Sequence, residues 1–204
     1  MVEVVFKPAE GVSGPADKER EEFLRSIATS VLLLALHPRC LISVTVQVMH
    51  DDGGVLACAI NAMCLALADS GLRMRAMVAA TVCAVTAAPT AAGDGAGGEA
   101  GGEVAGGGGR LLLDPDLAEE QGAGAVVITA HEHKAGGAAG VVSSHTTGRL
   151  NEQQYFACLE ASSQAALSTV AFMRTAIEAR LHREHASVFP QLQQPGANVV
   201  AMEE

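Results

Sequence analysis

Hydrophobic and polar residues alternate from Leu41 to Met49. The apolar positions share one face: Ile42, Val44, Val46 and Val48. A period of two residues is typical of a strand with one buried face. The sequence Asp51-Asp52-Gly53-Gly54 breaks the pattern. Carboxylates can cap a helix start, and glycines adopt backbone angles closed to other residues. These four residues therefore predict a turn into a helix.

The helix predicted after this turn runs from Val55 to Ala68 and is apolar almost all round, with Asn61 as its only strongly polar side chain. Such a helix is expected to be enclosed by other elements rather than half exposed. Gly71 stands where a left-handed C-cap would end it. Met77–Val85 then reads as a strand, so the stretch predicts a strand, a central helix and a second strand.

The remaining pattern predicts further strands and two long helices. The strands are expected at Val2–Phe6, Arg110–Asp114, Ala125–His131 and Gly140–His145. The helices are expected at Asp17–Leu36, entering the core along its length, and at Leu150–His185, opened by Asn151 and Glu152. The second helix should cover a sheet face with apolar side chains: Tyr155, Phe156, Leu159, Leu167, Val170, Phe172, Met173 and Ile177. This order of elements indicates an α+β or α/β class.

Two segments are expected to stay outside the packed domain. Residues 86–109 hold ten of the 22 glycines and cannot bury enough surface to offset the entropy of ordering, so they predict a disordered hairpin loop. They lack the strand–GxxxxGK[ST]–helix context of a phosphate-binding loop. Residues 186–204, which include Pro190 and Pro195, predict a mobile tail.

Composition narrows the function classes. With 13 basic and 23 acidic residues, the net charge of -10 argues against a general nucleic-acid-binding surface, so any RNA contact must be local. The five cysteines form no CxxC pair and predict reduced thiols, with Cys58, Cys64 and Cys158 in the core. No signal peptide or membrane-spanning run is visible, which predicts a soluble intracellular protein without a membrane partner.

Two motifs carry a family resemblance: PRCLISVTVQVMHDDGG at residues 38–54 and NAMCLALADSGLRMR at residues 61–75. Together they resemble the RNase PH family, which includes ring subunits of the eukaryotic RNA exosome. LLLDPDLAEEQ at Leu111–Gln121 is similar to one type of these subunits. The resemblance implies one domain at residues 1–185, with the mixed sheet packed with helices that RNase PH shares with the second domain of ribosomal protein S5.

The resemblance also sets an expectation for the N-terminus. Family members place further strands and an Arg-rich segment ahead of the strand that begins here at Val2, so these strands are expected to be missing. An incomplete sheet has an unpaired edge, which tends to recruit another chain. A nonfunctional truncated product stays among the alternatives.

By resemblance, RNase PH enzymes cleave the terminal RNA linkage with inorganic phosphate, held by an arginine that follows the paired glycines. Here Leu56 and its neighbours follow the glycines, and Gly122-Ala123-Gly124 stands where the catalytic aspartate of active members falls. The amides of Gly53 and Gly54 leave a weak phosphate site at a helix N-terminus, which the adjacent aspartates oppose. Loss of phosphorolysis is therefore expected.

The function that the resemblance implies is a noncatalytic ring subunit. It would scaffold the exosome and line its RNA channel for 3′-to-5′ RNA processing and decay, including rRNA maturation. The implied partners are other RNase PH-like ring subunits, RNA-binding cap subunits and RNA. No cofactor is expected, and the implied locations are the nucleus, the nucleolus and the cytoplasm.

The resemblance places RNA contacts at four basic residues: Arg39, Arg75, Lys18 and Arg20. The residues alone leave another interpretation open. Lys18, Arg20 and Arg25 are also consistent with solvated helix charges that pair with Glu19, Glu21 and Glu22. Arg75 is also consistent with a surface pair to Asp69 or another acid.

An acidic cluster supplies the alternative function. Asp114, Asp116, Glu119 and Glu120 could bind a divalent metal such as Mg²⁺ and support hydrolysis by a weak homodimeric nuclease. Asp114, Glu119 and Glu120 are the catalytic candidates, and Glu120 is the first choice because it falls nearest the lost aspartate. The other interpretation is a charged turn at the start of a short helix, where acids are favourable.

Two histidine pairs are not expected to bind a metal. His131-Glu132-His133 places two imidazoles on one strand face without HExxH spacing or a helix, which predicts a surface pair rather than a metal site. His182 and His185 predict capping or solvated side chains near the end of the last helix.

Overall fold

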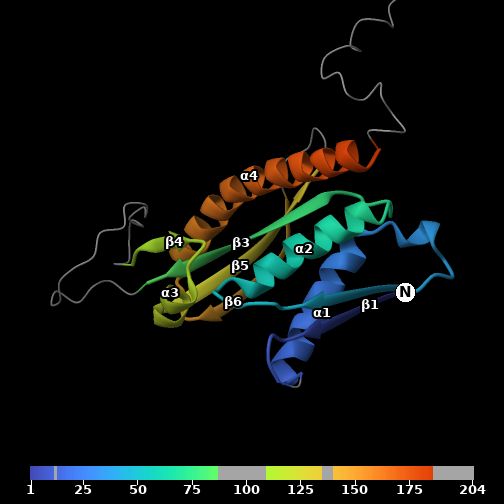
Figure 1. Cartoon of the computed structure of the whole chain (residues 1–204). Coiled ribbons are helices and arrows are strands. Elements are labelled where there is room, and N and C mark those ends of the chain that lie inside the picture. The colour runs from blue at the N-terminus through green and yellow to red at the C-terminus, as the bar shows by residue number, and fades with distance from the viewer. Residues whose placement is uncertain (12, 87–108, 135–139, 186–204) are drawn as a thin grey trace, which may run out of the picture. The chain divides into compact units, whose positions relative to one another are not determined.

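The computed structural model describes residues 1–11, 13–86, 109–134 and 140–185. Its elements are β1 (Val2–Lys7), α1 (Pro15–Val31), the 3₁₀ helix η1 (Leu34–Leu36), β2 (Ile42–Gln47), α2 (Val55–Asp69), β3 (Met77–Val85), β4 (Leu111–Leu113), α3 (Leu117–Gly122), β5 (Ala125–His133), β6 (Gly140–Gly148) and α4 (Glu152–His185) (Figure 1). The chain divides into two compact units, Met1–Val170 and Ala171–Glu204. The predicted glycine-rich loop, apart from its end residues, and the predicted tail lie outside the described residues.

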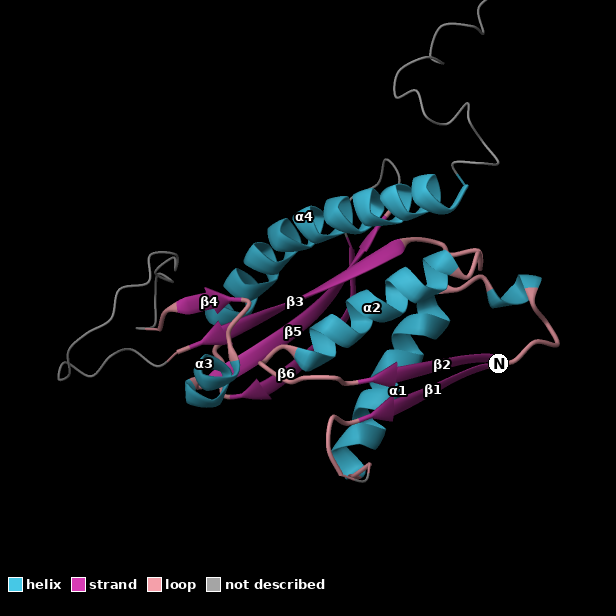
Figure 2. Ribbon diagram, viewed as in Figure 1, coloured by secondary structure: helices cyan, strands magenta, loops and turns pink. Residues whose placement is uncertain are grey.

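The strands of the first unit form two sheets (Figure 2). β1 and β2 pair in parallel, with Val4 opposite Val44. The other four strands pair antiparallel in the order β4-β3-β5-β6. The predicted α+β fold is confirmed, and its mixed character arises from a parallel pair and a separate antiparallel sheet.

Helices cover both faces of the four-stranded sheet. Even-numbered residues of β3 and β5, such as Val82 and Ile128, join the core that includes Ile60 and Met63 of α2. Odd-numbered residues, such as Cys83 and Val127, pack instead with Cys158 of α4. The alternation of side chains along a strand therefore gives each strand two buried faces, and the predictions for Cys64 and Cys158 as core residues are confirmed.

α2 is central, but it is not enclosed on every side. Its buried residues include Leu56, Ile60 and Leu67, while Cys58, Ala62 and Ala66 are exposed. The exposed residues recur every four positions and form one stripe along the helix. These residues count as apolar in the sequence pattern. Their side chains are small, however, so the stripe exposes little apolar surface to solvent. The predictions of full enclosure and of a core Cys58 were therefore wrong.

Two predicted helices differ from the structure in extent or exposure. α1 ends at Val31, not Leu36, because Leu32 pairs with Met74 and the Leu33 N–H donates to the Arg73 carbonyl at 3.1 Å. Leu33 and Leu36 are consequently exposed. In α4, Phe156 and Leu167 are 58% and 57% exposed, so they do not cover a sheet face as predicted. Phe172, in the second unit, is 71% exposed.

The histidine pair on β5 is buried rather than on the surface. β5 continues to His133, two residues beyond the predicted end, and it pairs with β3 along its whole length. His131 is 2% exposed and His133 is 7% exposed. The His131 Nε2 lies 3.2 Å from the Thr129 hydroxyl. The prediction of a surface pair was wrong because the strand, with neighbours on both sides, is longer than its apolar pattern indicates.

Among the described residues, no helix combines the length and the apolar character that crossing a membrane requires.

Candidate functional site

A glycine turn between β2 and α2 sets the geometry of the site. Gly53 and Gly54 have φ angles of +100° and +61°, a region that glycine enters without strain. A Cβ on Gly53 would lie 2.8 Å from the Pro115 carbonyl oxygen and 2.9 Å from the Leu117 nitrogen. The turn therefore lets the backbone that leads into α3 pack directly against it.

The amides of this turn are occupied by carboxylates of the chain itself. The Gly53 N–H donates to Asp51 Oδ1 at 3.1 Å, and the Gly54 N–H donates to Glu120 Oε2 at 2.9 Å. Gly54 is the N-cap of α2 and has no side-chain cap of its own, so the prediction that the aspartates cap the helix was wrong. The weak phosphate site predicted at Gly53 and Gly54 thus has its two donors already engaged.

A cleft of about 420 Å³ lies beside the turn. Its walls come from α1, α2, α3, β5 and β6 and from the turn that precedes α2. The lining residues are Ala16, Glu19, Arg20, Phe23, Asp51, Val55, Leu56, Leu117, Glu120, Gln121, Val126, Ile128, His145 and Thr147. The lining holds three carboxylates and one guanidinium. Arg20 is itself held 3.0 Å from Asp17 Oδ1 and lies over the Phe6 ring at 5.5 Å. The cleft therefore offers an anion little uncompensated positive charge.

The acidic cluster around α3 forms a capped turn. Asp116 Oδ1 accepts from the Glu119 N–H at 2.7 Å, and Glu119 Oε2 accepts from the Asp116 N–H at 3.2 Å. Glu120 reaches across to Gly54 instead, and Asp114 adopts a φ of +54° at the end of β4. Among the residues that the structure describes, no three His, Cys, Asp or Glu side chains come together as metal ligands. The structure assigns Asp116 and Glu119 to capping, as the second interpretation of this cluster expected.

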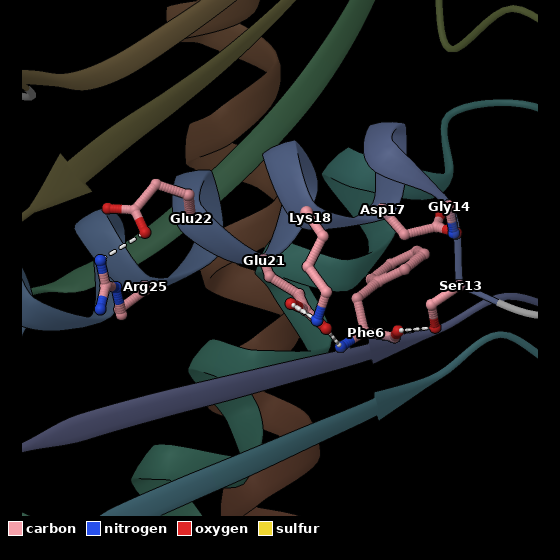
Figure 3. Close-up of polar contacts among 8 residues, drawn as sticks. All are labelled: Phe6, Ser13, Gly14, Asp17, Lys18, Glu21, Glu22 and Arg25. Atoms are coloured by element: carbon pink, nitrogen blue, oxygen red, sulfur yellow. Dashed lines mark hydrogen bonds and ion pairs between the residues drawn. The ribbon is translucent and has the colours of Figure 1, made fainter.

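Cations along α1 pair with acids on the same helix (Figure 3). Lys18 Nζ lies 2.8 Å from Glu21 Oε2, and Arg25 pairs with Glu22. Glu21 also accepts the Phe6 N–H on the edge of β1 at 2.9 Å, and these two partners, Lys18 first, hold the pKa of its carboxyl below the ordinary value. Solvated, paired helix charges are therefore confirmed for Lys18 and Arg25, whereas Arg20 pairs with Asp17.

The four residues predicted to contact RNA do not lie together. Lys18 and Arg20 belong to the first turns of α1. Arg75 lies near the other end of this helix, because its backbone N–H donates to the carbonyl of Val31, the last residue of α1, at 2.8 Å. The 17 residues of α1 span about 26 Å at 1.5 Å per residue. Arg39 is exposed between η1 and β2. Arg75 pairs with Glu132 at 3.4 Å, so the interpretation of a pair to an acid is confirmed.

Several residues of the cleft carried no local signal in the sequence. Phe23 and His145 lie on α1 and β6, and their rings meet edge to face at 5.6 Å between centroids. Glu120 and Gly54 are 66 residues apart. Only the tertiary fold brings these groups to the glycine turn, and Glu120 was singled out for a catalytic role rather than for this contact.

The chain is similar to proteins named as exosome components. The sequence model of the 3′ exoribonuclease family, domain 1, matches residues 2–73. The exosome complex exonuclease RRP46 homolog of Arabidopsis thaliana is 32% identical over 192 residues, 84% of this chain and 70% of that protein. Its Oryza sativa counterpart is 30% identical over 190 residues, 87% of this chain and 71% of that protein.

A solved structure agrees with the sequence relatives. The crystal structure of rice Rrp46 superimposes with a TM-score of 0.71 at 30% sequence identity, over 87% of this chain and 73% of that chain. The fold and the matched sequences thus define a protein of the 3′ exoribonuclease family, and the amides of its glycine turn donate to carboxylates of the chain itself. The chain belongs to the RNase PH family, in its RRP46 branch, which confirms the resemblance seen in the motifs.

Proposed function

We propose that this chain is a noncatalytic ring subunit of the RNA exosome, which scaffolds the ring and lines its RNA channel. Membership of the RRP46 branch supports the assembly, because the relatives carry exosome names. The observation that supports the lack of catalysis is the contact of the Glu120 carboxylate with the Gly54 amide at 2.9 Å. It places a negative charge at the helix end where a phosphate would bind.

The electrostatics of the cleft argue in the same direction. An incoming phosphate would face Glu19, Asp51 and Glu120, while the one lining guanidinium, Arg20, already pairs with Asp17. Like charges at about 4 Å repel by roughly 1 kcal/mol in water and by several times more near a protein surface. Leu56 adds an apolar wall where a phosphate-binding arginine would stand in active members of the family.

The proposal extends to partners and location. Its partners are other RNase PH-like ring subunits and RNA-binding cap subunits. Its RNA contacts are Arg39 and Arg75, which are exposed and do not line the cleft. The chain uses no cofactor in this role. It acts in 3′-to-5′ RNA processing, including rRNA maturation, in the nucleus and the nucleolus and also in the cytoplasm. Imaging of a tagged chain tests these locations, and absence from the nucleolus would contradict the rRNA role.

Two measurements test the proposed function together. The chain is co-expressed with RNase PH-like ring subunits, and we expect it to copurify with them in a stoichiometric ring. The purified chain and the ring are then incubated with 3′-tailed RNA with and without inorganic phosphate. We expect that this chain contributes no phosphate-dependent release of nucleoside diphosphates, either alone or in the ring. Such release from the chain alone would overturn the noncatalytic role, and failure to copurify would overturn the ring assignment.

The plant relatives are named exonucleases, which favours a test of the alternative function. A weak homodimeric nuclease would use Mg²⁺ at Asp114, Glu119 and Glu120. It predicts Mg²⁺-dependent shortening of RNA by the purified chain, lost in Glu120→Gln and kept in the control Glu160→Gln. Activity of that pattern would replace the noncatalytic proposal, whereas equal activity of both variants would point to a contaminating nuclease.

A further inference from the structure

Three exposed cations, Arg73 and Arg75 at the α2–β3 junction and Lys134 directly after β5, are here called the basic rim. Arg73 and Arg75 flank Met74 in an extended segment whose backbone bonds to the end of α1. Side chains alternate in extended backbone, so both arginines are exposed while Met74 is half-buried. The fold thus presents two guanidinium groups on the same side of one short segment.

The third cation joins them through a shared carboxylate. Glu132 Oε1 lies 2.8 Å from Lys134 Nζ, and Glu132 Oε2 lies 3.4 Å from Arg75 Nη2. Lys134, first, and then Arg75 hold the pKa of the Glu132 carboxyl below its ordinary value. Because one carboxylate serves two cations, the group keeps a surplus of positive charge.

Arg73 adds a cation that is not neutralised. Within the described ranges of the chain, its guanidinium forms no hydrogen bond or ion pair, and the side chain is exposed. On α1, by contrast, Lys18, Arg20 and Arg25 each pair with an acid. The acid nearest to Arg73 along the chain is Asp69, the last residue of α2. In a chain with a net charge of -10, the basic rim is therefore a local reversal of sign.

We propose that the basic rim binds the phosphate backbone of single-stranded RNA, with Arg73 and Lys134 as contacts additional to Arg75. The identity of the ligand as RNA rests on the proposed function. No Phe, Tyr or Trp occurs at residues 69–78 or 130–134, and His131 and His133 are buried, so these two segments expose no ring on which a base could stack. Cations that contact phosphates alone position a strand without reading its sequence.

The test compares variants of the full chain in RNA-binding titrations over a series of salt concentrations. Arg73→Gln/Lys134→Gln removes two rim cations, and Lys7→Gln/Arg25→Gln removes two exposed cations elsewhere, so both variants change the net charge equally. Glu132→Gln removes the acid of the rim. The probes are labelled oligo(U) and oligo(A).

We expect the rim double variant to weaken binding several-fold at low salt and to flatten the plot of log affinity against log salt by about 1.4, about 0.7 for each lost phosphate contact. The control double variant should change the slope by less than half of this amount. Glu132→Gln should tighten binding, and both oligonucleotides should bind alike. Equal loss in the two double variants, or no tightening in Glu132→Gln, would overturn the proposal.

Copurification with ring subunits separates this inference from the proposed function. If the unchanged chain fails to enter a ring but the rim variants still lose RNA binding selectively, the ring assignment fails and the rim stands. If the rim variants bind RNA normally but leave the ring, the surface is a protein interface and the inference fails.

Discussion

Glu120 and Gly54 lie 66 residues apart, and their contact gives a partly buried amide an acceptor. A buried donor that loses its acceptor is destabilising by about 1–3 kcal/mol, which is more than the bond itself contributes on average. The same contact holds α3 against the glycine turn. One carboxylate therefore stabilises the cleft and makes it unsuited to an anion.

Replacing Glu120 by Ala should lower the free energy of unfolding by about 1–3 kcal/mol, because the Gly54 N–H loses its acceptor. Glu120→Gln keeps an oxygen that can accept, so its effect should be under about 1 kcal/mol. Urea unfolding measures both, with exposed Glu160→Ala as the control. If the alanine and glutamine variants lose the same amount, the charge and not the hydrogen bond is what matters at this position.

The burial of His131 should make the stability of the fold depend on pH. Burial, with a smaller effect of neighbouring His133, lowers the pKa of its imidazole below the ordinary value of 6.5. Below pH 6.5 the unfolded chain takes up a proton at His131 that the folded chain resists. The contribution of His131 to the unfolding free energy should therefore fall as the pH drops through this range and stay constant above it.

The measurement is urea unfolding at about pH 7.5 and about pH 5.5 for the parent, His131→Gln and the exposed control His182→Gln. We expect the parent and the control to lose stability on acidification and His131→Gln to lose less. If His131→Gln loses as much unfolding free energy between the two pH values as the parent does, the acid sensitivity belongs to another group.

At the scale of elements, local patterns predicted the strand and helix types well. The alternation in β2, the bounds of β3 and the left-handed Gly71 at the end of α2 all match the structure. The end of α1 did not follow from the pattern, since the apolar run continues to Leu36. A backbone pairing between Leu32 and Met74 ends the helix, and a pairing across the fold leaves no mark on the local sequence.

The glycine turn gives the sharpest element-scale prediction. Gly53→Ala combines a φ of +100° with backbone atoms at 2.8–2.9 Å from the new Cβ, so neither the turn nor α3 can keep its place. We expect a loss of more than about 2 kcal/mol of unfolding free energy. Gly11→Ala is the matched control, because its φ is +85° but no atom lies within 4 Å of the Cβ. Equal losses in thermal or urea unfolding would show that backbone strain alone accounts for the effect.

At the scale of the molecule, the acidic composition predicted that RNA contacts must be local, but it did not predict which residues make them. Cations are neutralised on α1 and left in excess at the basic rim, and this division depends on which acids the fold brings near. The walls of the cleft likewise come from five elements. Both features depend on long-range packing, whereas the family motifs already identified the fold.

The parallel pair β1–β2 yields the last prediction. In the part of the chain that the structure describes, these strands pair only with each other, and a two-stranded sheet is marginally stable by itself. One face packs on the core through Val2, Val4 and Phe6. Hydrogen exchange should therefore be faster in β1 and β2 than in β3 and β5, which have strand neighbours on both sides. Ring partners that pair with or cover a free edge should slow exchange in β1 or β2 and leave β3 unchanged. Equal protection in the isolated chain, or no change on assembly, would show that the α1 and α2 packing already stabilises this pair fully.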